Sequence, residues 1–123
     1  MADPRRQVGA SGEEAAAAHL RRAGFEVLER NARTRYGELD IVGLDGSVLV
    51  FVEVKALRGA GRERAAQALE SIGARKRLQV RRLARAWLAE RQAPGRYSSI
   101  RFDAIGVAVR PGSVDVIHVP AAF

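Results

Sequence analysis

A glutamate and a lysine close the most hydrophobic stretch of the chain, residues 48–55, which reads VLVFVEVK. This stretch predicts a strand covered on both faces, and side chains two residues apart share a face of a strand. Glu53 and Lys55 therefore lie together where the strand leaves the core. Burying even a neutral polar group there costs on the order of 2–7 kcal/mol, so the carboxylate requires a cation, a partner or a ligand. For an arbitrary E-x-K, an ion pair at a sheet edge is the commoner explanation.

The preceding strand, YGELDIV, carries two further acids on one face, Glu38 and Asp40. The Asp45–Gly46 dipeptide predicts a tight hairpin between the two strands, which brings Asp40 beside Glu53. Carboxylates that converge in this way repel one another unless a divalent cation lies between them. Mg²⁺ suits such oxygen ligands and often uses one or two carboxylates plus substrate phosphate. A nearby lysine would orient or help to deprotonate the attacking water and offset charge at phosphorus.

Longer segments make the pattern more specific. GEEAAAAHLRRAGFEVLERNARTRYGELDIV, VFVEVK and RFD together resemble the bacterial YraN family of small endonuclease-like proteins, over about residues 9–109. Within them, Asp40 and the run Glu53-Val54-Lys55 match the D–(D/E)-x-K signature of the restriction-endonuclease-like nucleases, which include archaeal Holliday-junction resolvases. That short signature is common by chance, so the longer segments carry the resemblance.

The resemblance implies an α/β fold, namely a restriction-endonuclease-like three-layer core in which helices flank a central mixed β-sheet. It also implies a Mg²⁺ or Mn²⁺ site in which Asp40 and Glu53 hold the metal, Lys55 serves the water and Glu13 of the first helix completes the site. The sequence departs from the family pattern in three places, none of which removes a proposed ligand. They are His19 for a usual tyrosine, EVKALR for EVKTR around Arg58, and Leu39 where many superfamily members have proline.

Charge favours a polyanionic partner. The chain has a net charge of +7 and a pI near 11.1, values typical of nucleic-acid binders. Lysine occurs only at Lys55 and Lys76, and the arginine bias can equally reflect genome base composition. The basic helix can be an ordinary solvated face or a contact surface for phosphates. The candidate nucleic-acid contacts are Lys76, Arg58, Arg75, Arg77 and Arg81.

Length and composition limit the classes of protein. The 123 residues suit a single domain, 1–123, whose first nine residues we expect to be mobile. The absence of cysteine excludes disulfides and thiolate zinc sites, and the two histidines are far apart in sequence. No apolar run approaches the ~20 residues of a membrane span. The N-terminus does not resemble a signal peptide, so we expect no membrane association and a cytoplasmic location.

The expected elements follow the order α-β-β-β-α-β-β. Ser11 predicts the N-cap of a first helix, with Glu14 completing a capping box and Gly24 ending the helix. A loop is expected over residues 56–64, and a helical region over 64–92, with Gly73 as a candidate interruption and APG at 93–95 as its end. The apolar stripe of this region comprises Val80, Leu83, Ala84, Trp87 and Leu88. IRFDAIGVAV and VDVIHV predict two further strands.

Two functions remain open at this point. The first is a metal-dependent, structure-selective DNA endonuclease that acts on branched or double-stranded DNA in repair or recombination, plausibly as a homodimer. The second is a non-catalytic module that binds nucleic acid or a protein partner and retains the nuclease fold. RNA is an equally suitable polymer for a basic phosphate-binding surface. Arg101 and Asp103 share a strand face and are interpreted as a structural pair, and His118 as an ordinary surface or strand residue.

Overall fold

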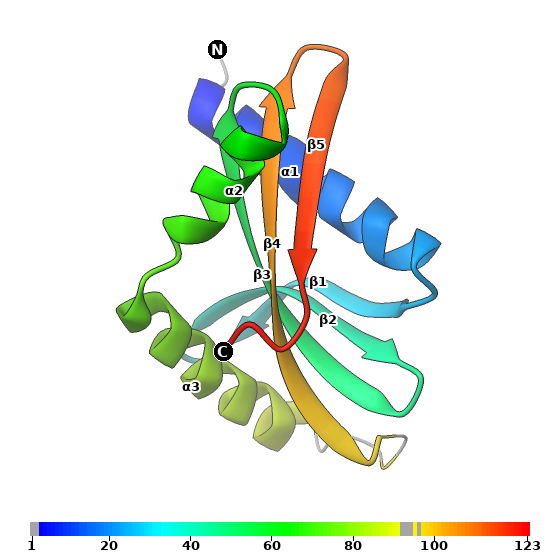
Figure 1. The fold of residues 1–123 in the computed structure, drawn as a ribbon. Coiled ribbons are helices and arrows are strands. Elements are labelled where there is room, and N and C mark those ends of the chain that lie inside the picture. Colours follow the sequence, from blue (N-terminus) through cyan, green and yellow to red (C-terminus); the bar gives the residue numbers. More distant parts are fainter. Residues whose placement is uncertain (1–2, 92–94, 96) are drawn as a thin grey trace.

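The computed structural model describes residues 3–91, 95 and 97–123. A mixed sheet lies between helices, with strands in the order β1-β2-β3-β4-β5 (Figure 1). Neighbouring strands are antiparallel except for β3 and β4, which are parallel. The helices are α1 (Pro4–Arg22), α2 (Arg62–Glu70) and α3 (Ala74–Arg91); the strands are β1 (Glu26–Thr34), β2 (Gly37–Asp45), β3 (Val48–Arg58), β4 (Ser99–Arg110) and β5 (Ser113–Val119).

Strand β3 is buried on both faces, as its hydrophobic run predicts. Leu49 and Phe51 join the core cluster against α3, whereas Val50 and Val52 join the cluster against α1. The α3 side of the core is completed by the stripe that the helical periodicity predicts, since Val80, Leu83, Ala84 and Trp87 are buried and Leu88 is partly buried. The three-layer α/β architecture expected of a restriction-endonuclease-like core is therefore confirmed.

Two glycines allow the helices to approach the sheet closely. A Cβ atom on Gly12 of α1 would collide with Ala56 of β3, and one on Gly106 of β4 would collide with the carbonyl oxygen of Ala65 in α2. Helix α1 therefore packs directly on β3, and α2 packs on β4 beside it, where Gly106 pairs with Lys55.

The first helix begins earlier than the capping signal predicted. It starts at Pro4, and the Asp3 carboxylate caps it by accepting a hydrogen bond of 2.9 Å from the Arg5 N–H. Proline is favoured at the first helical position because its ring presets φ. The N–H that it lacks would have no partner within the helix at that position. Ser11 and Glu14 lie inside the helix, so the predicted capping box is wrong, and residues 4–9, expected to be mobile, are helical.

The other boundaries agree with the sequence in part. The helical region is interrupted at residues 71–73, as Gly73 indicated, which separates α2 from α3. Strand β3 continues through Arg58, because each residue up to that point pairs with β4, so the predicted loop begins three residues too early. The Asp45–Gly46 turn is confirmed, with Gly46 at φ 61°. Gln92 and the Ala93–Pro94 part of the predicted helix stop lie outside the described residues.

Candidate active site

The candidate site forms where β2 and β3 separate. Their regular pairing ends at Ile41 and Val52, one residue before Asp40 and Glu53 would face each other. In the gap, the Asp40 Oδ2 atom accepts a hydrogen bond of 2.8 Å from the Val54 N–H. A side-chain carboxylate thus replaces the backbone acceptor of the lost strand pair. Asp40 is therefore held in one orientation between the strands.

Glu53 enters the site from the α3 side of the sheet. Its residue is only 8% exposed, and its Oε1 atom lies 3.8 Å from the Nζ atom of Lys76, at the start of α3. Lys55, two residues further along β3, is exposed to solvent. The ion pair of Glu53 is therefore made with Lys76, although Lys55 is its neighbour on the strand face.

The two carboxyl groups perturb each other. Burial, followed by repulsion from Asp40, raises the pKa of Glu53 to about 8, against the opposing effect of Lys76. Burial also raises the pKa of Asp40, although the Val54 N–H and a hydrogen bond with Glu53 act in the opposite direction. A hydrogen bond between two carboxyl groups requires a proton on one of them. The pair therefore retains a proton near neutral pH in the absence of a bound cation.

A third acid approaches Asp40 from the opposite side of the sheet. Burial and then repulsion from Asp40 raise the pKa of Glu13 in α1, whereas Arg30 and a side-chain hydrogen bond with Asn31 lower it. Asn31 lies opposite Asp40 in the β1–β2 register and has φ 50°, a left-handed conformation that asparagine tolerates better than most residues. Its contact with Glu13 assigns a positioning role to a residue that sequence reasoning left without one.

The acids suit a hard divalent cation. Asp40 and Glu53 offer oxygen ligands at one buried point, and Lys76 compensates only part of their charge. Within the described residues, no group of three or more histidine or acidic side chains converges as a complete metal centre. Mg²⁺ does not require one, because it commonly uses one or two carboxylates and takes its remaining ligands from water and phosphate. The residues present therefore fit the metal that the resemblance implies.

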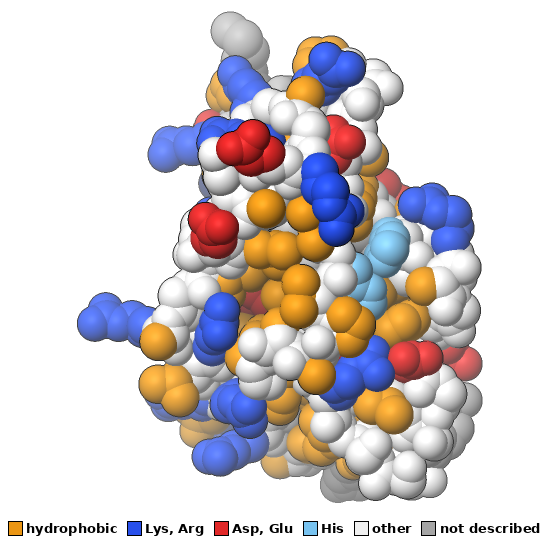
Figure 2. Space-filling model, in the orientation of Figure 1, with side chains coloured by type: hydrophobic (Ala, Val, Ile, Leu, Met, Phe, Trp, Pro, Cys, Tyr) orange, Lys and Arg blue, Asp and Glu red, His pale blue; other side chains and the backbone are white. Residues whose placement is uncertain are grey.

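Of the predicted basic contacts, Lys76 belongs to this site and the arginines lie outside it. Lys55 and Arg58 line a hollow of about 640 Å³ between the exposed part of β3 and the start of α1. Figure 2 shows Lys and Arg side chains gathered over α3. Among them, Arg81 stacks on Phe102 at 4.7 Å and Arg77 on Phe123 at 5.8 Å, measured to the ring centroids. Arg75 is exposed on the same helix, while Lys76 turns to Glu53.

Asp103 is buried outside the candidate site. Arg101 binds it with two hydrogen bonds of 2.8 and 2.9 Å, which confirms the predicted structural pair. His118 donates a further bond of 2.8 Å to Asp103. It lies in β5, as the strand interpretation predicted, but its side chain is only 10% exposed, so it is not an ordinary surface residue. His19 contacts the other ring nitrogen of His118 at 3.2 Å.

Comparison with known proteins identifies the family. The sequence profile described as "Uncharacterised protein family UPF0102" matches residues 12–107, a span that includes Glu13, Asp40 and Glu53. The chain belongs to the UPF0102 family. It is 47% identical to the UPF0102 protein of Nocardia farcinica over 117 residues, covering 94% of this chain and 88% of that protein.

Other UPF0102 proteins match over almost their whole length. The chain is 47% identical to that of Frankia casuarinae, covering 94% of this chain and 95% of the relative. The protein of Syntrophotalea carbinolica is 42% identical over 123 residues, which span this entire chain and 96% of the relative. The family therefore shares the whole domain, including all three layers around the site.

Within the described residues, none of the helices is long and apolar enough to cross a bilayer.

Proposed function

We propose that this UPF0102 protein is a metal-dependent endonuclease that hydrolyses phosphodiester bonds in branched or double-stranded DNA. One observation carries the proposal. Asp40 and Glu53 are brought together at a buried break in the sheet, where the pKa of each is raised and where one lysine only partly offsets their charge. Placing carboxylates so that they repel each other destabilises the empty site, which is typical of sites that act on a ligand.

The side chains of the site have separable tasks. Asp40, fixed by the Val54 N–H, and Glu53, on the central strand β3, would hold Mg²⁺ or Mn²⁺. Glu13 would support Asp40 from α1. The bound cation would supply Lewis-acid activation of water and of the phosphate oxygens.

The two lysines differ in availability. Lys76 is paired with Glu53 and sets the charge of the empty site. Lys55 is exposed at the rim, on the face of Glu53, so its ammonium group is free to approach the attacking water or the scissile phosphate. A compact ammonium can approach one oxygen atom as a point charge, which the larger guanidinium does less well. Lys55 is therefore the residue we expect to serve the reacting water.

The arginines of α3 support DNA as the substrate class. Arg77 and Arg81 rest on aromatic rings, which limits their motion, and Arg77 also donates from its Nε–H to the Ile72 carbonyl at 3.3 Å. Contacts from such residues to the phosphate backbone position a duplex without reading its bases. The proposal is accordingly a nuclease selective for DNA structure rather than sequence, with a role in repair or recombination.

A cleavage assay on labelled substrates with Mg²⁺ or Mn²⁺ tests the proposal. The panel contains a four-way junction, a flap, a duplex, single-stranded DNA and RNA. We expect cleavage by the native protein and its loss in Glu53→Gln, which keeps the side-chain shape, while Glu63→Gln on the exposed start of α2 remains active. Equal cleavage by both variants contradicts the mechanism. Binding without cleavage of any substrate instead indicates a non-catalytic module that keeps the nuclease fold.

A further inference from the structure

An exposed tyrosine lies between arginines at the far end of the β1–β2 hairpin. Tyr36 is 45% exposed, and the guanidinium carbons of Arg82 and Arg35 lie 4.4 and 5.2 Å from its ring centroid. These three residues, together with Arg85, line a hollow of about 440 Å³ beside α3. We call these four residues the Tyr36 cluster.

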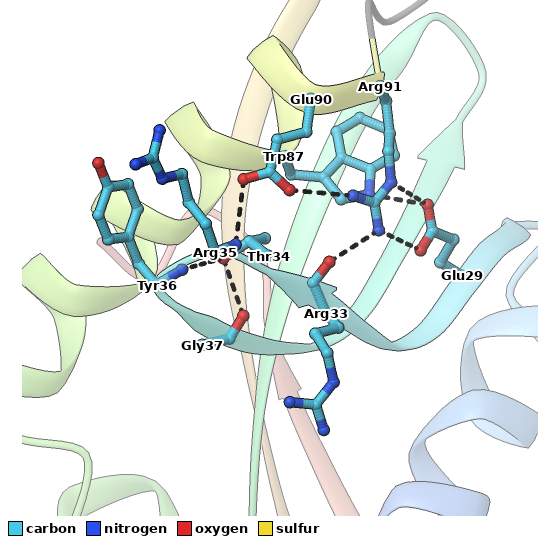
Figure 3. Close-up of polar contacts among 9 residues, drawn as sticks. All are labelled: Glu29, Arg33, Thr34, Arg35, Tyr36, Gly37, Trp87, Glu90 and Arg91. Atoms are coloured by element: carbon cyan, nitrogen blue, oxygen red, sulfur yellow. Dashed lines mark hydrogen bonds and ion pairs between the residues drawn. The ribbon is translucent and has the colours of Figure 1, made fainter.

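The turn that carries Tyr36 is held by its own hydrogen bonds (Figure 3). The Thr34 hydroxyl donates to the Gly37 carbonyl at 2.8 Å and accepts from the Tyr36 N–H at 3.1 Å. The Arg35 N–H donates to the Glu90 carboxylate of α3 at 3.1 Å. The backbone on both sides of the tyrosine is thus fixed although its ring is exposed.

A second set of bonds attaches β1 to the end of α3 (Figure 3). Arg91 binds the Glu29 carboxylate through two hydrogen bonds of 2.9 Å and also donates to the Arg33 carbonyl at 3.1 Å. The Trp87 indole N–H donates to the same carboxylate at 2.9 Å. The hairpin and the helix therefore present the Tyr36 cluster as one rigid surface, which lowers the entropic cost of binding a ligand there.

Within the part of the chain that the structure describes, the arginines of the cluster have no acidic partners. Among the described residues, no carboxylate lies within 4.0 Å of the guanidinium nitrogens of Arg35, Arg82 or Arg85, unlike those of Arg91 and Arg101. Glu90 also borders the hollow, but its oxygens already accept from the Arg35 N–H and lie 3.5 Å from Arg91. Three cations on one surface repel one another, and an anion would relieve that repulsion.

The stacking geometry selects the kind of anion. A guanidinium that lies on an aromatic ring uses its flat face, so its N–H edges stay available for two parallel bonds to a phosphate. The same geometry disfavours an unpaired base as the ligand, because the guanidiniums already occupy space over the ring that a stacking base would need.

We propose that the Tyr36 cluster is a phosphate-binding site that holds the DNA backbone on one side of the scissile bond. The inference rests on the proposed function, because it relates the position of the bound phosphate to the position of the candidate active site. Tyr36 stands four residues before Asp40 along the β2 arm, on the order of 13 Å for an extended chain. That distance equals about four nucleotide steps of 3.4 Å, measured along the axis of a duplex. A phosphate bound at the Tyr36 cluster would therefore set the distance between this cluster and the point at which the strand is cut.

Salt-dependent DNA binding tests the site without requiring catalysis. Binding of a fluorescent four-way junction and of a fluorescent duplex is measured by anisotropy in EDTA between about 50 and 200 mM KCl, where each phosphate contact contributes roughly 0.9 to the slope of log K against log salt. The variants are Arg35→Gln, Arg82→Gln and their combination. The matched control is Arg22→Gln, an exposed arginine at the end of α1, on the other side of the sheet.

We expect each variant of the cluster to lower affinity and to reduce the slope by about one unit, with a larger reduction in the double variant and none in the control. Tyr36→Leu removes no charge and is expected to weaken binding about threefold, because the arginines lose the ring that orients them. An unchanged slope and affinity in the double variant, with native cleavage activity, overturns the site alone. Failure of the native protein to bind either DNA overturns the site and the proposed function together.

Discussion

Two aspartates occupy similar positions in the sheet but have opposite electrostatic settings. Asp40 lies where β2 leaves β3, and Asp103 lies where β5 leaves β4, one residue before the last pair of Ala104 and Val119. Asp103 is bound by Arg101, His118 and the Ala121 N–H, and these donors outweigh burial and lower its pKa to about 2. The pKa of Asp40 is raised, because burial outweighs its donors.

The difference separates a structural carboxylate from the one that we propose as a metal ligand. A buried carboxylate that serves stability is surrounded by donors, whereas Asp40 has one backbone donor and three acids, Glu13, Glu38 and Glu53, close enough to influence its pKa or to be influenced by it. The fold thus places the same residue type at two points where neighbouring strands separate, and it surrounds only Asp103 with donors. Asp40 is the aspartate whose surroundings we expect a cation to complete.

The largest predicted effect tests stability at the two aspartates. Asp103→Asn keeps the side-chain shape but leaves His118 without a charged partner and Arg101 with the Asp45 carboxylate alone among the described residues, so we expect a loss of about 3–5 kcal/mol in the free energy of unfolding. Asp40→Asn relieves repulsion and can still accept from the Val54 N–H, so we expect a change within about 1 kcal/mol. Urea denaturation measures both values. A similar loss of unfolding free energy for the two substitutions would contradict the difference between the two aspartates.

The pH dependence of unfolding should have opposite signs at the two sites. The lowered pKa of Asp103 adds stability that is present above about pH 4 and lost as the pH falls towards 2. The raised pKa of Glu53 adds stability that is present below its ordinary value of 4.5 and lost as the pH rises through about 8. Each slope is at most about 1.4 kcal/mol per pH unit.

Denaturation midpoints across this pH range, without metal, provide the measurement. We expect Glu53→Gln to flatten the decline between about pH 5 and 8 while the acid side remains that of the native protein. Asp103→Asn serves as the reciprocal control, because it should alter the acid side. A decline that is as steep in Glu53→Gln as in the native protein would show that another group causes it.

Metal binding should stabilise the protein in a pH-dependent way. A ligand at 100 times its Kd adds about 2.7 kcal/mol, which corresponds to a rise in Tm of roughly 10 °C for a chain of this size. Mn²⁺ must displace the proton that Asp40 and Glu53 retain, so the rise should be larger at about pH 9 than at about pH 6. Calorimetry with and without EDTA measures it.

Variants at the two aspartates sharpen this test. The rise in Tm on adding Mn²⁺ should persist in Asp103→Asn, whose side chain belongs to another network, and should disappear in Glu53→Gln. A rise that survives in Glu53→Gln would place the metal elsewhere.

The smallest predicted effect concerns the lysine beside Glu53. Lys76 lowers the pKa of both Asp40 and Glu53, so Lys76→Met should raise the pKa of Glu53 further. The increase should be below about one pH unit, because Lys76 is half exposed and such pairs contribute at most about 1 kcal/mol. Carboxyl NMR titration measures it, and Lys55→Met is the matched control with a smaller expected change. An equal change in both variants would contradict the preference of Glu53 for Lys76.

Local sequence patterns predicted the residues of the site that lie on adjacent strands. The period of two along β3 placed Glu53 and Lys55 on one face, and the Asp45–Gly46 turn brought Asp40 to the same level. Both inferences need only strand geometry and a short hairpin. The N-cap was predicted wrongly for an equally local reason, because Asp3 followed by Pro4 competes with Ser11 as a helix start.

Contacts between distant segments were not predictable in the same way. The sequence places Lys76 among the basic residues of a helix, and only the packing of α3 on the sheet turns it to Glu53. His118 reads as an unremarkable strand residue until the β4–β5 register sets it against Asp103. Tyr36 and Arg82 are joined by the position of the hairpin against α3.

The sequence by itself determined the family, the buried central strand and the acids of the candidate site, because periodicity, turn chemistry and motif spacing act over a few residues. The tertiary structure decided which of those charges are compensated. Asp103 meets an arginine and a histidine, whereas Asp40 meets three other acids. The physical reason is that burial and the distances between charges set a carboxylate's pKa, and both depend on segments that only the folded chain brings together.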